Sequence, residues 1–213
     1  EMNETTKEAS RIAAEMNRLS PHLYNLRKEN RVAIYFSNEA LTSMNYYAIS
    51  PETDYNTLLL KFYEQLYKLN IECDFVDHTK KDLSRYKLII VPALYSASKE
   101  ETDRLNDFVA NGGHVVYTFR SGFTDENVKV HPIRQPAPFR EQVGASYQQF
   151  TSIDKMPLKS TKLKTRGADL AFDSWIELMI PEGAEVWATY GSPYWGQYAA
   201  ITHHKSGRGA VTY

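Results

Sequence analysis

The chain alternates short apolar runs with longer segments in which apolar residues recur at helical spacing. Residues 32–36 (VAIYF) and 87–91 (KLIIV) are the clearest runs, and each is bounded by polar residues or by proline. Continuous apolar runs of this length are typical of strands that are buried on both faces of a parallel sheet. We expect strands at these positions and also at residues 71–76 and 115–119.

Helical spacing is clearest in two segments. In residues 5–19, Thr5 and Glu8 have the spacing of a capping box, and we expect Pro21 to stop the helix. Residues 55–69 place their leucines near one stripe, which predicts a helix with one buried face.

A third helix is predicted between the last two of these strands. Ser98 and Glu101 have capping-box spacing, and the apolar positions continue to Val109. The glycine pair that follows provides the left-handed stop typical of helix C-termini. Residues 37–54 carry no comparable pattern, and we expect a loop there.

The alternation of strands and helices predicts right-handed crossovers. After residue 143 the pattern changes to short strand-like segments separated by turn residues. These segments are residues 144–150, 175–180, 185–190, 198–203 and 210–213. The expected fold class is α/β, with a doubly wound, mostly parallel sheet, flanking helices, and extra antiparallel strands in the C-terminal half.

Charge and hydropathy narrow the choice of partners. The 213 residues include 25 basic and 26 acidic side chains, a balance that argues against a broad electrostatic grip on nucleic acid. No apolar run is long enough to span a bilayer, so we expect no membrane partner. Residues 1–20 are polar and carry no secretory signal, although a fragment could have lost one. The expected location is cytoplasmic.

Metal and cofactor sites are not predicted by residue spacing. Cys73 is the only cysteine, so neither a disulfide within the chain nor a cysteine metal cluster can form. His203 and His204 are neighbours on a predicted strand and therefore point to opposite faces. Ligand-like spacing is also lacking at His78, His114 and His131. The glycine pair closes a helix, whereas a phosphate loop would open one.

Two catalytic interpretations also lack their structural context. Asn38 and Glu39 follow the first strand, as the Asn–Glu pair does in many barrel glycosidases, but an eight-fold barrel typically takes about 250 residues. Ser121 follows the fourth strand without a glycine two positions before it, and Cys73 lies inside a strand. We therefore expect no catalytic residue in this chain.

Aromatic residues are abundant, with 15 Tyr, 9 Phe and 3 Trp. Tyr194, Trp195 and Tyr198 lie close together in the sequence and can stack on sugar rings. Packing in a core or an interface is the alternative, because each ring carries a large apolar area.

Several stretches, taken in order, resemble a known family. They are residues 82–95 (DLSRYKLIIVPALY), 108–122 (FVANGGHVVYTFRSG), 138–144 (PFREQVG), 198–202 (YAAIT) and 207–213 (GRGAVTY). Together they resemble the middle, or trimerisation, domain of glycoside hydrolase family 42 β-galactosidases over most of the chain.

The resemblance implies a flavodoxin-like fold of the class I glutamine amidotransferase type, without amidotransferase chemistry. In active amidotransferases the turn after the fourth strand carries a nucleophilic Cys between glycines. The corresponding turn here is Phe119-Arg120-Ser121-Gly122, which has no thiol. The family's two catalytic glutamates belong to an N-terminal barrel, which binds the galactoside and which these residues do not include.

The resemblance also implies a domain division. The chain opens in a helical pattern and closes inside a strand-like run. We expect residues 1–30 to be a helical connector from a catalytic barrel, and residues 31–213 to be the trimerisation domain with its C-terminus cut.

The expected function is non-catalytic self-association, as a trimer, of a β-galactosidase that hydrolyses terminal β-D-galactosides. Candidates for the subunit contact or the substrate funnel, most of them near the carboxyl edge of the sheet, are Tyr46, Tyr47, Tyr95, Arg120, Phe123 and Trp195. Two alternatives stay open: an independent hydrolase that uses Ser121 or Cys73, and a carbohydrate-binding module built on the three clustered aromatic residues near position 195.

Overall fold

A computed structural model of the protein describes residues 3–48, 54–160, 162–163 and 170–213. Its first half contains α1 (Glu4–Leu23), β1 (Val32–Tyr35), α2 (Asn38–Tyr46), α3 (Tyr55–Lys68), β2 (Cys73–Val76), β3 (Leu88–Val91), α4 (Lys99–Ala110) and β4 (His114–Tyr117). Its second half contains η1 (Ala137–Phe139), α5 (Arg140–Val143), β5 (Ala145–Ser146), β6 (Phe150–Lys159), β7 (Ala171–Glu177), β8 (Ile180–Pro181), β9 (Glu185–Tyr190), β10 (Ala199–Ser206) and β11 (Gly209–Thr212).

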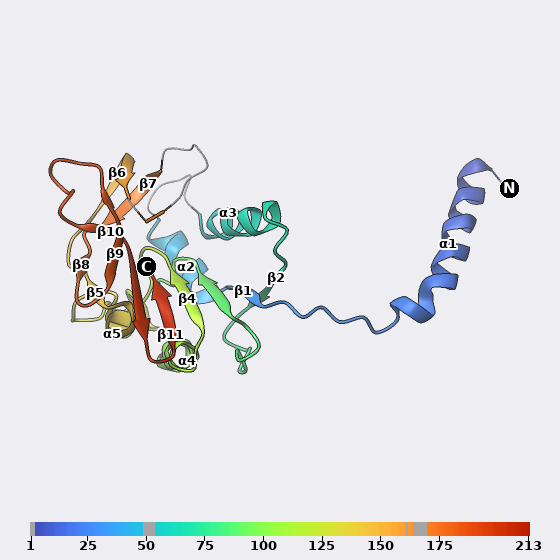
Figure 1. The fold of residues 1–213 in the computed structure, drawn as a ribbon, viewed down its shortest axis with the longest axis horizontal. Helices are drawn as coiled ribbons and strands as arrows, with labels where there is room; N and C mark the ends of the chain where they lie inside the picture. The colour runs from blue at the N-terminus through green and yellow to red at the C-terminus, as the bar shows by residue number, and fades with distance from the viewer. Residues whose placement is uncertain (1–2, 49–53, 161, 164–169) are drawn as a thin grey trace.

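The main sheet joins a parallel half to an antiparallel half (Figure 1). Within the described residues its nine strands follow the order β2-β1-β3-β4-β11-β10-β9-β6-β7. Strands β2, β1, β3, β4 and β11 are parallel, and every pair from β11 to β7 is antiparallel. The predicted fold class is confirmed, and the order 2-1-3-4 is that of flavodoxin-like sheets.

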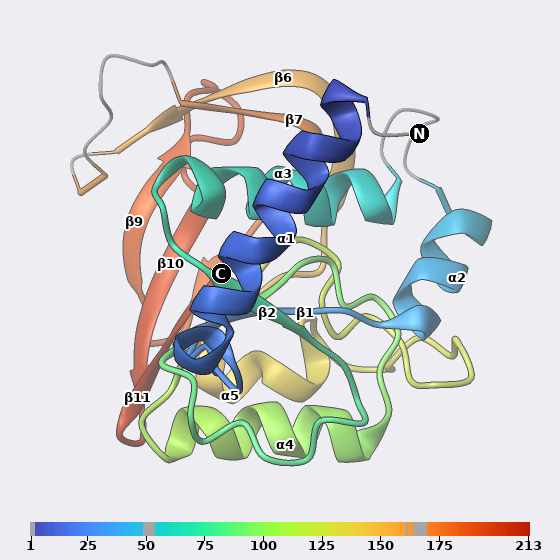
Figure 2. The same cartoon turned by 90° about the vertical axis from the view of Figure 1, so that its right-hand side faces the viewer.

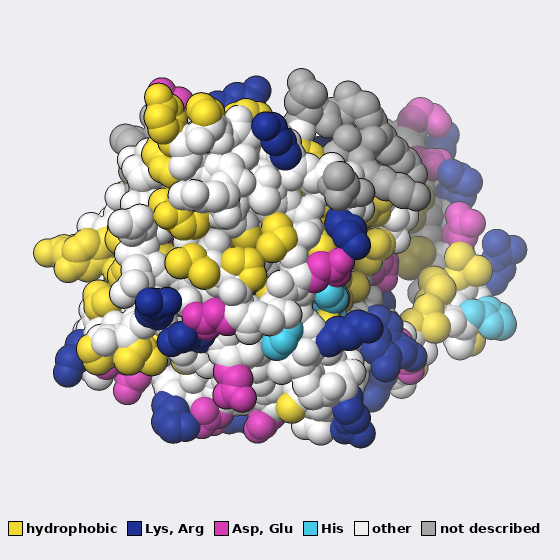
Figure 3. Space-filling view, turned by 60° about the vertical axis from the view of Figure 1, so that its left-hand side comes forward, with side chains coloured by type: hydrophobic (Ala, Val, Ile, Leu, Met, Phe, Trp, Pro, Cys, Tyr) yellow, Lys and Arg dark blue, Asp and Glu magenta, His cyan; other side chains and the backbone are white. Residues whose placement is uncertain are grey.

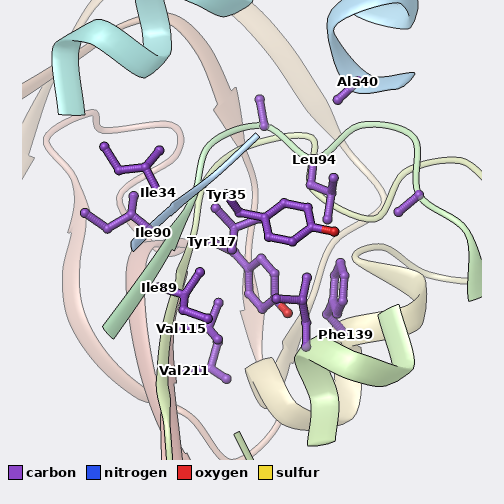
Figure 4. Close-up of a cluster of buried hydrophobic side chains, with 14 of the residues drawn as sticks. Ile34, Tyr35, Ala40, Ile89, Ile90, Leu94, Val115, Tyr117, Phe139 and Val211 are labelled. Atoms are coloured by element: carbon purple, nitrogen blue, oxygen red, sulfur yellow. The ribbon is translucent and has the colours of Figure 1, made fainter. Parts of the chain in front are cut away.

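Helices cover both faces of the parallel half. Figure 2 shows α3 on one side of these strands and α4 and α5 on the other. On the α4 side, Ile89, Val115 and Val211 lie in register across three neighbouring strands. Tyr117 stacks on Phe139 with 4.3 Å between ring centroids, and these side chains form the closed core seen in Figure 4.

The segment after β1 differs from the prediction. Residues 38–46 form helix α2, where the sequence analysis expected a loop; residues 49–53 of that predicted loop lie outside the described part of the chain. The Ser37 side chain caps the helix by accepting from the Ala40 N–H at 3.1 Å, and Ala40 and Met44 bury one narrow face. A short helix with two buried apolar residues gives too weak a period to be recognised in the sequence.

The first helix, α1, was predicted at residues 5–19 but spans Glu4–Leu23. Asn3, rather than Thr5, is the N-cap, because its side chain accepts from Thr6 N–H at 2.8 Å. Pro21 lies inside α1, and Tyr24 N–H closes the helix on the Ser20 carbonyl at 2.8 Å. Proline already has a helical φ, so near a helix end it costs one hydrogen bond without ending the helix.

The second half is strand-rich as expected, although two boundaries were wrong. Residues 144–150 contain only the two-residue strand β5 and the start of β6, which continues to Lys159. Residues 175–180 fall in two strands, β7 and β8. The β10–β11 turn was predicted correctly: Gly207 has φ +57°, and a Cβ there would lie 2.9 Å from the Ala110 backbone.

Helix α1 stands apart from the rest of the molecule on an extended segment (Figure 1), and none of its residues is buried. Ile12, Met16 and Leu23 are about half exposed, at 50%, 54% and 45%. None of the helices in the described part of the chain has the length and apolar character needed to cross a membrane.

Candidate functional site at the carboxyl edge of the sheet

The turn after β4 holds a left-handed residue where the chain leaves the sheet. Arg120 has φ +60°, and Gly122 has φ +68°. A Cβ on Gly122 would lie 2.8 Å from the Phe139 ring, so both conformation and space favour glycine there. Arginine rarely adopts such a φ, and its presence indicates that surrounding contacts hold the turn in place.

Those contacts surround the Arg120 guanidinium. Its central carbon lies 4.5 Å from the Tyr95 ring centroid and 5.1 Å from that of Trp175. Its Nη1 donates to the Tyr47 carbonyl at 2.9 Å, which fixes the end of α2 to this turn. Only 9% of Arg120 is exposed, and this burial lowers the pKa of the guanidinium from its ordinary value.

A buried carboxylate occupies the other side of the turn. Glu177, at the end of β7, accepts from the Arg120 backbone N–H at 2.7 Å and from the Tyr213 hydroxyl at 2.7 Å. Trp175 Nε1 donates to it at 3.2 Å. Burial raises the pKa of Glu177, and these hydrogen bonds oppose that rise only in part.

Aromatic rings continue outward from these two residues to the surface. Successive ring centroids are 4.9 Å apart for Tyr46–Tyr47, 6.5 Å for Tyr47–Tyr95, 5.5 Å for Tyr95–Phe123, 5.6 Å for Phe123–Phe150 and 4.9 Å for Phe150–Trp175. We call these six rings, together with Arg120, the aromatic corner. Its rim is open, since Tyr46 is 81% exposed, Tyr47 49% and Phe150 44%.

Five of the six predicted contact residues therefore lie together in the aromatic corner. Tyr46 and Tyr47 reach it from the end of helix α2, whereas the sequence analysis placed them in a loop. Trp195 lies elsewhere: it packs, partly buried, on the second core cluster formed by Met156, Ile176, Leu178 and Tyr190.

Neither candidate nucleophile, Ser121 or Cys73, lies in surroundings that would activate it. Ser121 is fully buried, and its hydroxyl accepts from Leu94 N–H at 3.2 Å. Among the described residues, no histidine is hydrogen-bonded to it, so the base that a hydrolase needs is missing from this turn. Cys73 lies within β2 as expected, and burial raises the pKa of its thiol, which disfavours the reactive thiolate.

The clustered aromatic residues after β9 are divided between core and surface. Trp195 and Tyr198 pack against the second core cluster, whereas Tyr194 is 80% exposed. On the face that Figure 3 presents, apolar side chains form separate groups among charged and polar ones. A single exposed ring gives a sugar little stacking surface, so this geometry does not favour a carbohydrate-binding module.

A second group of side chains meets at the same edge of the sheet. Glu39, His78 and Glu101 come from three different elements, and their ligand atoms all lie within 4.8 Å of one another. His203 and His204 do face opposite sides, as predicted: one stacks on Trp187, and the other contacts the Gln142 carbonyl.

Sequence reasoning missed Glu177, Trp175 and Phe150. A sequence signal existed for Glu177, because it is the one charged residue within the apolar run of residues 175–180. Acidic residues are almost never fully buried unless they are paired, so a glutamate in such a run marks a polar contact.

Comparison with known protein families assigns the chain to one of them. The sequence profile described as the β-galactosidase trimerisation domain matches residues 30–213. The chain belongs to the β-galactosidase trimerisation domain family. The prediction made from the sequence motifs is confirmed.

Relatives and solved structures of this family are enzymes much longer than this chain. β-Galactosidase BgaB of Geobacillus sp. (strain Y412MC61) is 31% identical over 219 residues, which cover 100% of this chain and 31% of the relative. The crystal structure of a β-galactosidase from Bacillus circulans sp. alkalophilus has a TM-score of 0.90 and 27% identity, covering 100% of this chain and 32% of that one. Gan42B, a GH42 β-galactosidase from G. stearothermophilus, has a TM-score of 0.85 and 25% identity, with 97% and 30% covered. This chain thus spans about a third of the length of these relatives.

Proposed function

We propose that this chain is the assembly domain of a larger β-galactosidase and that the aromatic corner forms part of the contact between three copies. The family assignment supports self-association. The corner supplies what such a contact needs, namely exposed aromatic rings on a rigid base. Tyrosine, tryptophan, phenylalanine and arginine are the residue types enriched where protein surfaces bind one another.

The rigid base is the observation that carries this proposal. Arg120 bonds the Tyr47 carbonyl, and its guanidinium lies between the Tyr95 and Trp175 rings. The base of the corner is therefore ordered before any partner arrives, so binding would require little further ordering of these side chains. A threefold assembly would repeat the contact by closed rotation, so one patch on each copy meets a different patch on the next.

The relatives are the basis for a proposal about the rest of the parent protein. We propose that residues 1–30 connect a catalytic barrel to this domain at residues 31–213, and that the exposed apolar side chains of α1 pack against that barrel. The barrel would bind and hydrolyse terminal β-D-galactosides, and the parent enzyme would be cytoplasmic. The length of the relatives and the absence of buried residues in α1 support this division.

Equilibrium sedimentation of three proteins tests the assembly surface. The wild-type chain has a mass of 24.5 kDa, and we expect its average mass to rise with concentration toward three times that value. The double variant Tyr46→Ser/Tyr47→Ser should associate at least about tenfold more weakly, because truncating an aromatic residue that becomes buried in a contact typically costs about 1 kcal/mol or more.

A matched control removes two exposed tyrosines elsewhere. Tyr24 and Tyr67 are 78% and 71% exposed and lie away from the corner, so the variant Tyr24→Ser/Tyr67→Ser should associate like the wild type. The proposal fails if the wild type stays at 24.5 kDa at every concentration. It also fails if the corner variant associates as tightly as the control.

A further inference from the structure

The strand order brings three potential metal ligands to one point. Glu39 lies in the first turn of α2 after β1, His78 follows β2, and Glu101 lies in the first turn of α4 after β3. Because β2, β1 and β3 are adjacent and parallel, these segments meet at the carboxyl edge, where such sheets form their crevice. One ligand atom from each residue lies within 4.8 Å of both others.

Glu101 is a buried and firmly oriented carboxylate. It is 4% exposed, its Oε1 accepts from the Tyr35 hydroxyl at 2.9 Å, and its Oε2 accepts from the Ser98 N–H and hydroxyl at 3.0 Å each. Ligating carboxylates of metal sites are commonly held by hydrogen bonds of this kind.

In the described part of the chain, neither carboxylate is paired with a basic side chain. Glu39 is half-buried, and among the described residues it accepts one hydrogen bond, from the Ser37 hydroxyl at 3.1 Å. Across the described residues, no Lys or Arg nitrogen lies within 4.0 Å of the Glu39 or Glu101 carboxylate. Two carboxylates this close repel each other, and a bound cation between them would remove that cost.

His78 contributes a free imidazole. It is exposed, and within the described part of the chain its ring forms no hydrogen bond. Its backbone is held instead, since Arg104 Nη1 donates to the His78 carbonyl at 2.8 Å while Arg104 Nη2 bonds Glu100 at 3.0 Å. The nearby guanidinium is thus occupied by other acceptors, and the ring stays free to turn toward the carboxylates.

We propose that Glu39, His78 and Glu101 form a binding site for a divalent transition metal of the zinc type. One imidazole and two carboxylates are ligands that zinc accepts, and three protein ligands leave a fourth position for water. A tetrahedral ion with ligands at about 2.0–2.1 Å places its ligand atoms about 3.4 Å apart. Because the ligand atoms now lie within 4.8 Å of one another, binding would require Glu39 and His78 to move closer to Glu101.

The proposed ion ties α2, the segment after β2 and α4 to one another. The sequence shows no ligand pattern because the three residues are far apart along the chain and meet only through the strand order. Magnesium is less suited, since it prefers oxygen ligands and retains its waters. The site is separate from the aromatic corner, so its test does not depend on self-association.

Calorimetric titration of Zn²⁺ into the 213-residue chain tests the site, with circular dichroism to verify folding of each variant. We expect one ion per chain. His78→Ala and Glu39→Gln should each weaken binding by more than about tenfold, because even outer-shell changes cost 10- to 100-fold. Both residues have exposed surface, so neither change should disturb the fold. Co²⁺ in place of zinc should give the visible absorption of a tetrahedral complex.

His22→Ala and Glu64→Gln serve as controls, because both residues are exposed and lie in other helices. They should bind zinc like the wild type. The proposal is overturned if the wild type shows no saturable binding, or if His78→Ala and Glu39→Gln bind as tightly as the controls. Equal weakening by His22→Ala would indicate surface histidine binding and would also overturn it.

Discussion

The aromatic corner and the Glu39–His78–Glu101 cluster lie along the same edge of the sheet but differ in how their charges are satisfied. In the corner, the Glu177 carboxylate accepts hydrogen bonds from Arg120, Tyr213 and Trp175, and aromatic rings cover the guanidinium. In the cluster, two carboxylates lie near each other with no lysine or arginine within 4.0 Å among the described residues.

This difference indicates that the aromatic corner has a structural role, whereas the Glu39–His78–Glu101 cluster can bind a ligand. Three hydrogen-bond donors and the neighbouring aromatic rings enclose the Glu177 carboxylate, which therefore holds the surrounding turn in place. In the cluster, Glu101 also accepts three hydrogen bonds, but Glu39 is half-buried and lies near the exposed ring of His78, which forms no hydrogen bond within the described residues. The corner therefore suits a rigid surface that other subunits contact, and the cluster suits an ion.

Removing the corner carboxylate should have the largest effect. Glu177→Ala leaves the Tyr213 hydroxyl, the Arg120 N–H and the Trp175 indole N–H without their acceptor. Buried polar groups that lose a charged partner typically cost about 3–5 kcal/mol in the free energy of unfolding. Urea denaturation measures this change. Glu126→Ala, at an exposed position, is the control; a loss for Glu177→Ala no larger than the control's would show that the corner does not depend on this carboxylate.

Removing the guanidinium should have an intermediate effect. Arg120→Ala loses two cation–π contacts and one hydrogen bond, for which we expect about 2 kcal/mol of destabilisation by urea denaturation. Arg120→Gly loses the same contacts but relieves the left-handed backbone, so it should be more stable than the alanine variant by about 1 kcal/mol. The reverse order of the two variants would contradict a strained turn.

The charge of Glu177 should appear in the pH dependence of stability. Burial raises its folded pKa above the ordinary 4.5. The folded state then binds the proton more tightly, so this stabilisation is fully present below the unfolded pKa and is lost as pH rises through the folded pKa. The free energy of unfolding of wild type minus Glu177→Gln should therefore fall as the pH increases.

Glu182→Gln provides the opposite slope as a control. Hydrogen bonding to Arg140 lowers the pKa of Glu182, so its stabilisation is present above 4.5 and is lost as pH falls. Thermal melts over a pH series measure both differences. A difference for Glu177→Gln that does not change with pH would contradict the raised pKa.

The smallest effect is expected in the cluster without metal. His78 is exposed and its ring makes no hydrogen bond within the described residues, so His78→Ala should change the metal-free free energy of unfolding by less than about 0.5 kcal/mol. If urea denaturation shows that His78→Ala lowers the free energy of unfolding by more than about 1 kcal/mol, the histidine has a structural role. That result would contradict the proposed difference between the cluster and the aromatic corner.

Much of the parallel half could be predicted from the sequence. Strands β1, β3 and β4 overlap the predicted segments because continuous apolar runs and flanking glycine or proline are local signals. Helix α2 was missed since its buried face consists mainly of Ala40 and Met44. Strand β6 was largely missed because its pairing with β7 is not a local signal, and six of its ten residues are exposed.

The site was predictable only where it depends on the parallel strands. Tyr95, Arg120 and Phe123 follow strand ends, and the rule that such ends share one edge brings them together. Glu177 and Phe150 reach the corner through antiparallel pairing, which no local pattern specifies. The same limit explains Trp195, whose turn folds onto the second core cluster.

Amide hydrogen exchange at low and high protein concentration tests the contrast most directly. If the aromatic corner is the contact between copies, peptides that contain Tyr46–Tyr47 and Phe150 will gain protection as concentration rises, and peptides that contain His78 and Glu101 will not. Protection that instead appears around Glu101, or on β9 and β10, or at no peptide, would contradict the account.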